Sequence, residues 1–283
     1  MVRLVHTPYW VYRQSVASGD SPEDLDAQSP SAGPSRLGRA GRELEEIVEP
    51  GARAARHLEP KVYADMIVPA WRRVTTGEPR WPVALGVLAA ICLQLALPRR
   101  VTFQHQWFLP FIELVMLIVL VATNPGRITP DKRRRILSMI LVATISVANI
   151  ISAGRLIARL LNGREENAGP LLLIGGAIWL TNVIAFSLWY WELDRGGPVG
   201  RALATHDYPD FLFPQMQAPE LAPPHWEPRY VDYLHMSFTN ATAFSPTDVM
   251  PLTRWAKLTM LVQSAISLTT VALVIARAVN ILH

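Results

Sequence analysis

Polar side chains interrupt a long apolar segment near the C-terminal end of the sequence. Thr259, Gln263, Ser267, Thr270 and Arg277 fall within about 80° of one another when residues are placed about 100° apart around a helix. Two interpretations follow. Either this face meets water and lines a pore, or its small and polar side chains mediate helix contacts, as is common in membranes.

Two other polar residues lie inside apolar segments. Glu113 follows Trp107 by six positions, and Asn182 lies near the middle of segment 171–191. An intramembrane carboxylate costs about 2.5 kcal/mol or more unless it is paired or hydrated. Glu113 therefore indicates either ion or proton handling or a structural pairing with a neighbouring side chain. Asn182 predicts a hydrogen-bonded bridge between helices, worth about 0.6 kcal/mol.

No motif in the sequence indicates an enzyme or a cofactor site. His206, His225 and His235 lack the spacing of metal ligands, and Cys92 is the single cysteine. Phosphate-loop, dinucleotide and nucleophile-elbow motifs are absent. The net charge is +4, but the basic residues flank apolar segments rather than forming a basic domain, so nucleic acid is not an expected partner. We therefore expect no catalytic residue, no metal and no cofactor.

Apolar residues are concentrated in five continuous segments. Half of the 283 residues are hydrophobic and 18% are charged. About 20 apolar residues in a helix cross the roughly 30 Å of membrane hydrocarbon. The sequence therefore predicts an all-α membrane protein with about five transmembrane helices, at 82–98, 108–123, 136–161, 171–191 and 256–282.

The composition divides the chain into three parts. Residues 1–75 are polar and rich in Ser, Pro and Gly, and we expect most of this N-terminal region to be disordered, with short surface helices within 40–75. Residues 76–169 form a three-helix membrane region. Residues 170–283 form a module of two helices joined by a long linker.

The basic residues also predict an orientation. If all five segments cross and the N-terminus is cytoplasmic, 13 Lys and Arg residues flank the segments on the cytoplasmic side and six flank them on the other. The positive-inside rule therefore favours a cytoplasmic N-terminus in a plasma (inner) membrane.

The linker from 192 to 255 changes character along its length. Its prolines rule out a long helix across 209–228, which we expect to run extended over the surface. Residues 229–242 are compatible with a helix, and Pro246 breaks the chain before the last segment. This helix is too short and too polar to span, and it enters a bilayer only if protein buries it or it lines a water-filled cavity. We therefore expect a re-entrant segment.

The order of these elements resembles the outer helix, pore helix, filter and inner helix of the potassium channel superfamily. Residues 237–242 match the end of the pore helix, Asp248 the filter aspartate and Pro251 the proline three residues on. The resemblance covers about 170–282 and implies a tetramer. The whole chain is also similar to a family of uncharacterised five-helix bacterial membrane proteins whose C-terminal part has the same pattern with an altered filter.

The filter departs from the channel pattern. Ser245 and Thr247 stand where those channels have glycines, and Pro246 lies between them. The glycines allow successive carbonyl groups to point at one axis, with backbone angles that Ser and Thr do not readily reach. A potassium-selective filter is therefore not expected.

The resemblance and the residues together lead to one expected function and one alternative. We expect a homo-oligomeric, channel-like membrane protein that conducts monovalent cations without potassium selectivity, with a constriction lined by Thr242, Ser245, Thr247 and Asp248. The alternative is a non-conducting scaffold or sensor in the bilayer. Channels place the filter loop outside the cell, whereas the charge count places it inside. Either the module is inverted, or segment 136–161 does not cross fully.

Overall fold

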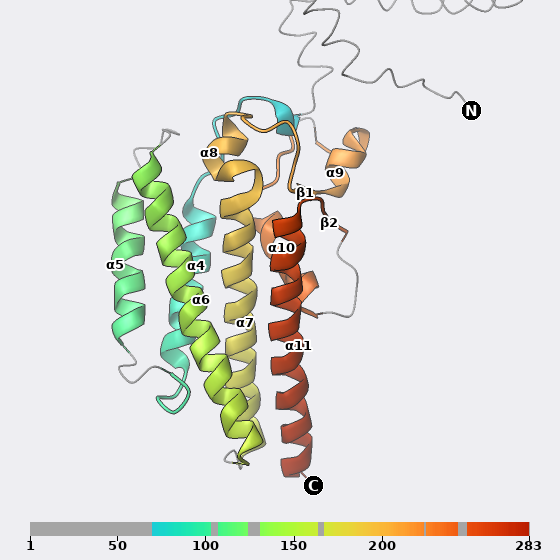
Figure 1. The fold of residues 1–283 in the computed structure, drawn as a ribbon. Helices are drawn as coiled ribbons and strands as arrows, with labels where there is room; N and C mark the ends of the chain where they lie inside the picture. The colour runs from blue at the N-terminus through green and yellow to red at the C-terminus, as the bar shows by residue number, and fades with distance from the viewer. Residues whose placement is uncertain are drawn as a thin grey trace, which may run out of the picture. The chain divides into compact units, whose positions relative to one another are not determined.

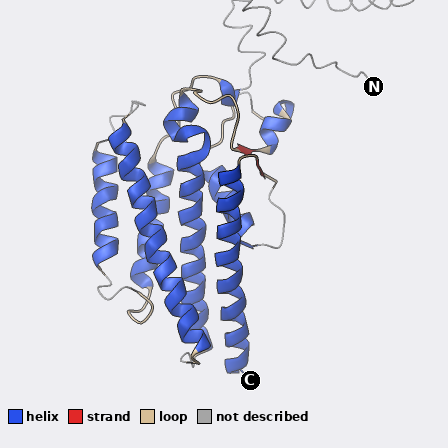
Figure 2. Cartoon of the chain, in the orientation of Figure 1, coloured by secondary structure: helices blue, strands red, loops and turns tan. Residues whose placement is uncertain are grey.

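A computed structural model describes residues 70–102, 107–123, 131–163, 167–223, 225–242 and 248–282. Most of these residues are helical, with loops and two short strands between the helices (Figure 2). The predictions for residues 1–69, including disorder and surface helices, and for Ser245 and Thr247 lie outside this part of the chain. Of the remaining N-terminal residues, 70–72 form the short helix η2 (Ala70–Arg72), and Trp71 is buried.

Helices occupy all five predicted apolar segments. They are α4 (Trp81–Ala96), α5 (Phe108–Ala122), α6 (Lys132–Leu161), α7 (Ala168–Leu193) and α11 (Arg254–Leu282). Helices α6, α7 and α11 are long and apolar enough to cross a membrane. Helices α4 and α5 are apolar but have only 16 and 15 residues, which at 1.5 Å per residue gives about 24 and 22 Å. Length alone therefore identifies three spanning candidates among the described helices.

Local sequence explains where these helices begin and end. Pro82 occupies the first turn of α4, where its missing N–H is tolerated. The Asp131 side chain caps α6 by accepting a hydrogen bond from the Arg133 backbone N–H at 3.0 Å. Helix α7 ends where Arg195 and Gly196 adopt positive φ angles of 50° and 78°.

Helix α7 is the centre of the bundle. It packs against α4, α6, α10 and α11, while α5 packs against α4 and α6. Figure 1 shows α5, α6, α7 and α11 side by side. Consecutive long apolar helices run in opposite directions, so α4, α6 and α11 begin, and α5 and α7 end, at one end of the bundle. We call this the linker end.

The linker after α7 is folded into short helices and a short strand. It contains η3 (Asp194–Gly196), α8 (Gly197–Ala202), β1 (Phe211–Leu212), α9 (Pro214–Gln217) and η4 (Pro219–Leu221). Its prolines do exclude a long helix, as predicted. The expectation of an extended surface path is met only in part: α9 and η4 are helical turns and Phe211 and Phe213 are buried in the core, whereas Glu220 and Leu221 are exposed.

Helix α10 (Tyr230–Thr242) lies alongside the second half of α7. Ser187 Oγ on α7 donates a hydrogen bond to the Tyr230 hydroxyl at 3.1 Å. One turn earlier in α7, the Val183 carbonyl accepts a hydrogen bond from the Ser237 hydroxyl at 2.6 Å. After α10 the chain returns to the linker end, where β2 (Met250–Pro251) pairs antiparallel with β1. The predicted helix over 229–242 is therefore present as α10, and β2 lies back at the linker end.

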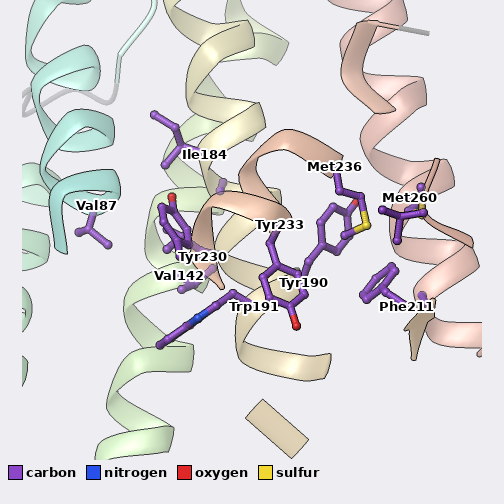
Figure 3. Packing of buried hydrophobic residues seen from close by; sticks show 14 of the residues in the cluster. Val87, Val142, Ile184, Tyr190, Trp191, Phe211, Tyr230, Tyr233, Met236 and Met260 are labelled. Carbon is purple, nitrogen blue, oxygen red and sulfur yellow. The ribbon is translucent and has the colours of Figure 1, made fainter. Parts of the chain in front are cut away.

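Aromatic side chains from α7, α10 and the linker form the core between these elements. Tyr190 and Tyr233 are fully buried, and Phe211 packs edge-on against Tyr190 with ring centroids 5.1 Å apart. Figure 3 shows these rings with Met236 of α10 and Met260 of α11. The core therefore joins α10 and the linker firmly to α7 and α11.

Helices α7 and α11 approach closely at a glycine. A Cβ atom at Gly175 would lie 2.8 Å from Cγ2 of Val274, whereas one at Gly176 would meet nothing within 4 Å. Small residues at such contacts let the backbones of membrane helices approach. We predict that Gly175→Ala lowers the free energy of unfolding in mixed micelles by about 1–3 kcal/mol through overpacking.

Gly176→Ala is the matched control because it adds the same methyl group to the neighbouring position of the same helix. Its unfolding free energy should stay within about 0.5 kcal/mol of the wild type. Equal effects of the two variants would contradict the close approach of α7 and α11 at Gly175.

Candidate functional site

The middle of the polar face predicted on the last helix, at Gln263, Ser267 and Thr270, is buried inside the subunit, whereas Thr259 and Arg277 are half-buried. Gln263 on α11 has no exposed surface. Its Oε1 accepts hydrogen bonds from the Tyr190 hydroxyl at 2.6 Å and from Asn240 Nδ2 at 2.8 Å. Its Nε2 donates to the carbonyl and the hydroxyl of Ser237 at 2.9 and 2.7 Å. One side chain thus joins α7, α10 and α11.

The other members of this face are also engaged within the chain. Ser267 Oγ accepts a hydrogen bond from Asn182 Nδ2 at 2.9 Å, which is the predicted type of bridge between helices. Thr259 and Thr270 donate to carbonyl groups one turn earlier in α11. Ser267 and Thr270 are 1% and 2% exposed. These contacts are those of the second interpretation of the face, in which polar residues mediate helix packing.

Two of the four predicted constriction residues are described. Thr242 is half-buried at the end of α10, and its hydroxyl donates to the Thr239 carbonyl at 2.8 Å. Asp248 is exposed where the chain returns toward β2. Ser245 and Thr247 lie outside the described residues. The structure thus separates Asp248, which meets solvent, from the buried polar face of α11.

Glu113 is fully buried between α5 and α4. Its Oε2 accepts a hydrogen bond from Gln94 Nε2 on α4 at 3.0 Å. Its other oxygen, Oε1, is buried without a hydrogen-bond partner in the described part of the chain. The partner is therefore an amide rather than a basic side chain, and the site holds a buried carboxyl group with one free acceptor.

A buried polar network fastens the linker to the end of α7. Asp194 has no exposed surface, and its Oδ2 accepts a hydrogen bond from the Tyr233 hydroxyl at 2.6 Å. Its Oδ1 accepts from the Asp210 backbone N–H at 3.0 Å, while Asp210 Oδ2 accepts from the Arg195 N–H at 2.8 Å. Asp210 also accepts from Trp255 Nε1 at 2.9 Å. The two aspartates therefore bind each other's chain segments and hold α10 and α11 to the same point.

Two arginines supply the opposite charge in this network. Arg195 is 2% exposed and donates to the Trp71 carbonyl at 2.6 Å. Arg201 donates to the carbonyls of Trp191 and Asp194 at 2.6 and 3.1 Å, and its guanidinium group lies 5.0 Å from the centroid of the Tyr233 ring. The charges are thus compensated within the protein, which is the requirement for burying them.

A cavity of about 650 Å³ opens at the linker end among α4, α5, α6 and α7. Its inner walls are apolar, and its mouth carries charged and polar side chains. The walls include Val83, Val87, Leu117, Leu120, Leu141, Val142 and Leu188, and the mouth includes Glu78, Arg80, Arg134, Ser138 and Glu192. An apolar interior with a few polar groups at one end is typical of a small-molecule site.

The carboxylates at this mouth are already engaged by the protein. Glu78 accepts hydrogen bonds from the Tyr230 backbone N–H at 2.7 Å and from Trp191 Nε1 at 2.8 Å. Burial raises the pKa of Glu78 above its ordinary value, and these hydrogen bonds oppose the shift. Glu192 is 3% exposed and accepts a hydrogen bond from Ser138. Neither carboxylate is therefore directed freely into the cavity.

Sequence reasoning missed the charged network and the cavity. Arg80, Arg195 and Arg201 are among the 13 cytoplasmic Lys and Arg residues in the positive-inside count, which treats them only as topology signals. Asp194 and Arg195, directly after a long apolar segment, are a usable signal of the network, because charged side chains at that position must find partners or water. The cavity had no such signal, since it arises from how four helices pack. The described residues contain no group of three His, Cys, Asp or Glu that could hold a metal ion.

Comparisons of the chain with protein-family models, with curated proteins and with solved structures found no match.

Proposed function

We propose that the protein is a multi-pass membrane protein that does not conduct ions, in which the channel-like module of 170–282 is a closed scaffold. The observation that carries this proposal is the burial of Gln263, whose amide oxygen and nitrogen make four hydrogen bonds inside the subunit. A pore lined by this face would need these groups to meet water instead.

The outer face of α11 supports the same proposal. Its exposed side chains are large and apolar: Leu258, Leu261, Val262, Leu268, Ile275 and Val279. Such a face suits lipid chains or the apolar face of a neighbouring helix, because apolar side chains can pack there without leaving a polar group unpaired. Helix α11 therefore turns these large apolar side chains outward and keeps Gln263, Ser267 and Thr270 within.

We propose that all five long apolar helices lie in the bilayer with the linker end in the cytoplasm. Helix α6 is continuous for 30 residues, or about 45 Å, so it is long enough to cross. Helices α4 and α5 run in opposite directions and return the chain to the same side whether or not each crosses fully. In this proposal the module is inverted relative to channels, and α10 is a re-entrant helix that enters from the linker end.

Cation flux into liposomes tests the proposal. Purified protein in liposomes containing a cation-sensitive dye should give no more cation entry than protein-free liposomes. An added cation ionophore should give the full dye response in both. Asp248→Asn should change nothing. Flux that depends on protein and is lost in Asp248→Asn would overturn the proposal.

A cation pore is the second candidate, and the exposed carboxylate of Asp248 is the observation that favours it. In a four-copy assembly Asp248 would form an acidic ring beside Thr242, Ser245 and Thr247, and such rings attract cations. The C-terminal end of α10 would add a partial negative charge. The flux assay separates the two candidates directly.

A further inference from the structure

We propose that the cavity at the linker end binds one anionic phospholipid, with an acyl chain among α4, α5, α6 and α7 and the phosphate at Arg80 and Arg134. The cavity has a volume of about 650 Å³, within the roughly 300–1,000 Å³ of ligand sites. The inference rests on the proposed placement of these helices in the bilayer but not on the absence of conduction.

The shape and lining of the cavity fit an amphiphile rather than a polar metabolite. Side chains from all four helices make the interior apolar, including Val87, Leu120, Leu141 and Leu188. Trp81 and Val121 at its rim are 64% and 56% exposed, so the cavity is open where α4 begins and α5 ends. A tryptophan at this level is typical of the membrane interface, where a headgroup would lie.

The charges at the mouth favour an anion. The Arg80 side chain makes no hydrogen bond or salt bridge to a described residue, although it lies near Glu192, and among the described residues the Arg134 side chain is paired with Asp131, at 3.4 Å. The residues lining the cavity and the small pocket beside it include three basic ones, Arg80, Arg134 and Arg135, and three acidic ones, Glu78, Asp131 and Glu192. Because Glu78 and Glu192 accept hydrogen bonds from Tyr230, Trp191 and Ser138, the Arg80 N–H groups are left to meet a phosphate.

The start of α6 strengthens this preference. Residues 132–135 are four consecutive basic residues at the positive end of a helix dipole, where cations are unfavourable and anions are favourable. A bound phosphate would relieve this repulsion. Basic pockets between helices on the cytoplasmic side are suited to anionic headgroups, which that leaflet supplies.

Native mass spectrometry of the full chain tests the site. The protein is reconstituted with equal amounts of phosphatidylglycerol and phosphatidylcholine, extracted in mild detergent, and the retained lipid is identified. Wild type should retain one phosphatidylglycerol. The double variant Arg80→Gln with Arg134→Gln should lower the preference over phosphatidylcholine by about 30-fold. Ala84→Phe, which fills the cavity, should lower retention of both lipids.

Matched controls separate the cavity from general surface attraction. Lys132→Gln with Arg133→Gln removes two exposed basic residues that do not line the cavity, and Ala89→Phe adds the same ring at an exposed position of α4. The first control should lower the preference for phosphatidylglycerol clearly less than the Arg80→Gln with Arg134→Gln variant does, and Ala89→Phe should retain lipid as wild type does. Equal losses in test and control variants, no retained lipid in wild type, or displacement of the lipid by millimolar inorganic phosphate or glycerol phosphate would each overturn the proposal.

Discussion

Replacement of Asp194 by alanine should lower the free energy of unfolding by about 3–5 kcal/mol, because it leaves two buried guanidinium groups without their carboxylate. Asp194 is fully buried, and it holds Tyr233 of α10 and the backbone of Asp210. Arg195 and Arg201 lie beside it and are 2% and 7% exposed. One substitution therefore unfastens the linker, α10 and the end of α7 together.

Unfolding of the purified protein in mixed micelles with increasing dodecyl sulfate measures this loss. Asp207→Ala is the matched control, since Asp207 lies in the same linker but is exposed. Its unfolding free energy should stay within about 0.5 kcal/mol of the wild type. The network would lose its assigned importance if Asp194→Ala were no more destabilising than Asp207→Ala.

Gln263→Leu should lower the free energy of unfolding by about 2–3 kcal/mol. Leucine fills a similar volume but cannot form hydrogen bonds. The Tyr190 hydroxyl, the Asn240 amide and Ser237 would then stay buried without their bonds to residue 263. Single hydrogen bonds between membrane helices contribute about 0.6 kcal/mol on average, so the larger effect depends on losing several together.

Thr269→Leu makes a comparable polar-to-apolar change on the exposed face of α11 and should leave stability unchanged or slightly raised. Both variants are compared in the same dodecyl sulfate titration. If Gln263→Leu were as stable as the wild type, the amide of Gln263 would have to be hydrated rather than packed, as the pore-lining interpretation requires.

The long apolar helices were largely predictable, because each one corresponds to a continuous apolar segment of the sequence. The predicted segment 108–123 and α5 differ by one residue at one end. Helix α6 begins four residues before its predicted segment, because residues 132–135 are basic and do not read as membrane-spanning, yet they continue the helix from the Asp131 cap. Charge marks the edge of the hydrocarbon and not the end of a helix.

The linker was predictable only in what it excludes. Proline spacing ruled out a long helix, but burial of Phe211 depends on contacts with Tyr190 and Trp255, which are distant in the sequence. The reciprocal bonds between Asp194 and Arg195 on one side and Asp210 on the other join segments 15 or 16 residues apart. Such pairings follow from the folded path and leave no periodic pattern.

The polar face of α11 illustrates the same limit. Its helical spacing was readable, but the side to which it turns depends on where α7 and α10 pack. The bridge between Asn182 and Ser267 was expected in kind, although its partner was not. The sequence indicates that burying Glu113 in an apolar segment costs free energy, but it does not indicate that Gln94, an amide in another apolar segment, is the hydrogen-bond partner.

Cysteine accessibility at Ser267 tests the central claim, that the middle of this polar face is sealed inside the subunit, most directly. Ser267→Cys is placed in a Cys92→Ala background, and the folded protein in liposomes is exposed to a charged, membrane-impermeant thiol reagent from both sides. Asp207→Cys in the same background reports full exposure. The account predicts no modification at 267 while position 207 reacts completely. Modification of 267 at a rate similar to that at 207 would contradict it.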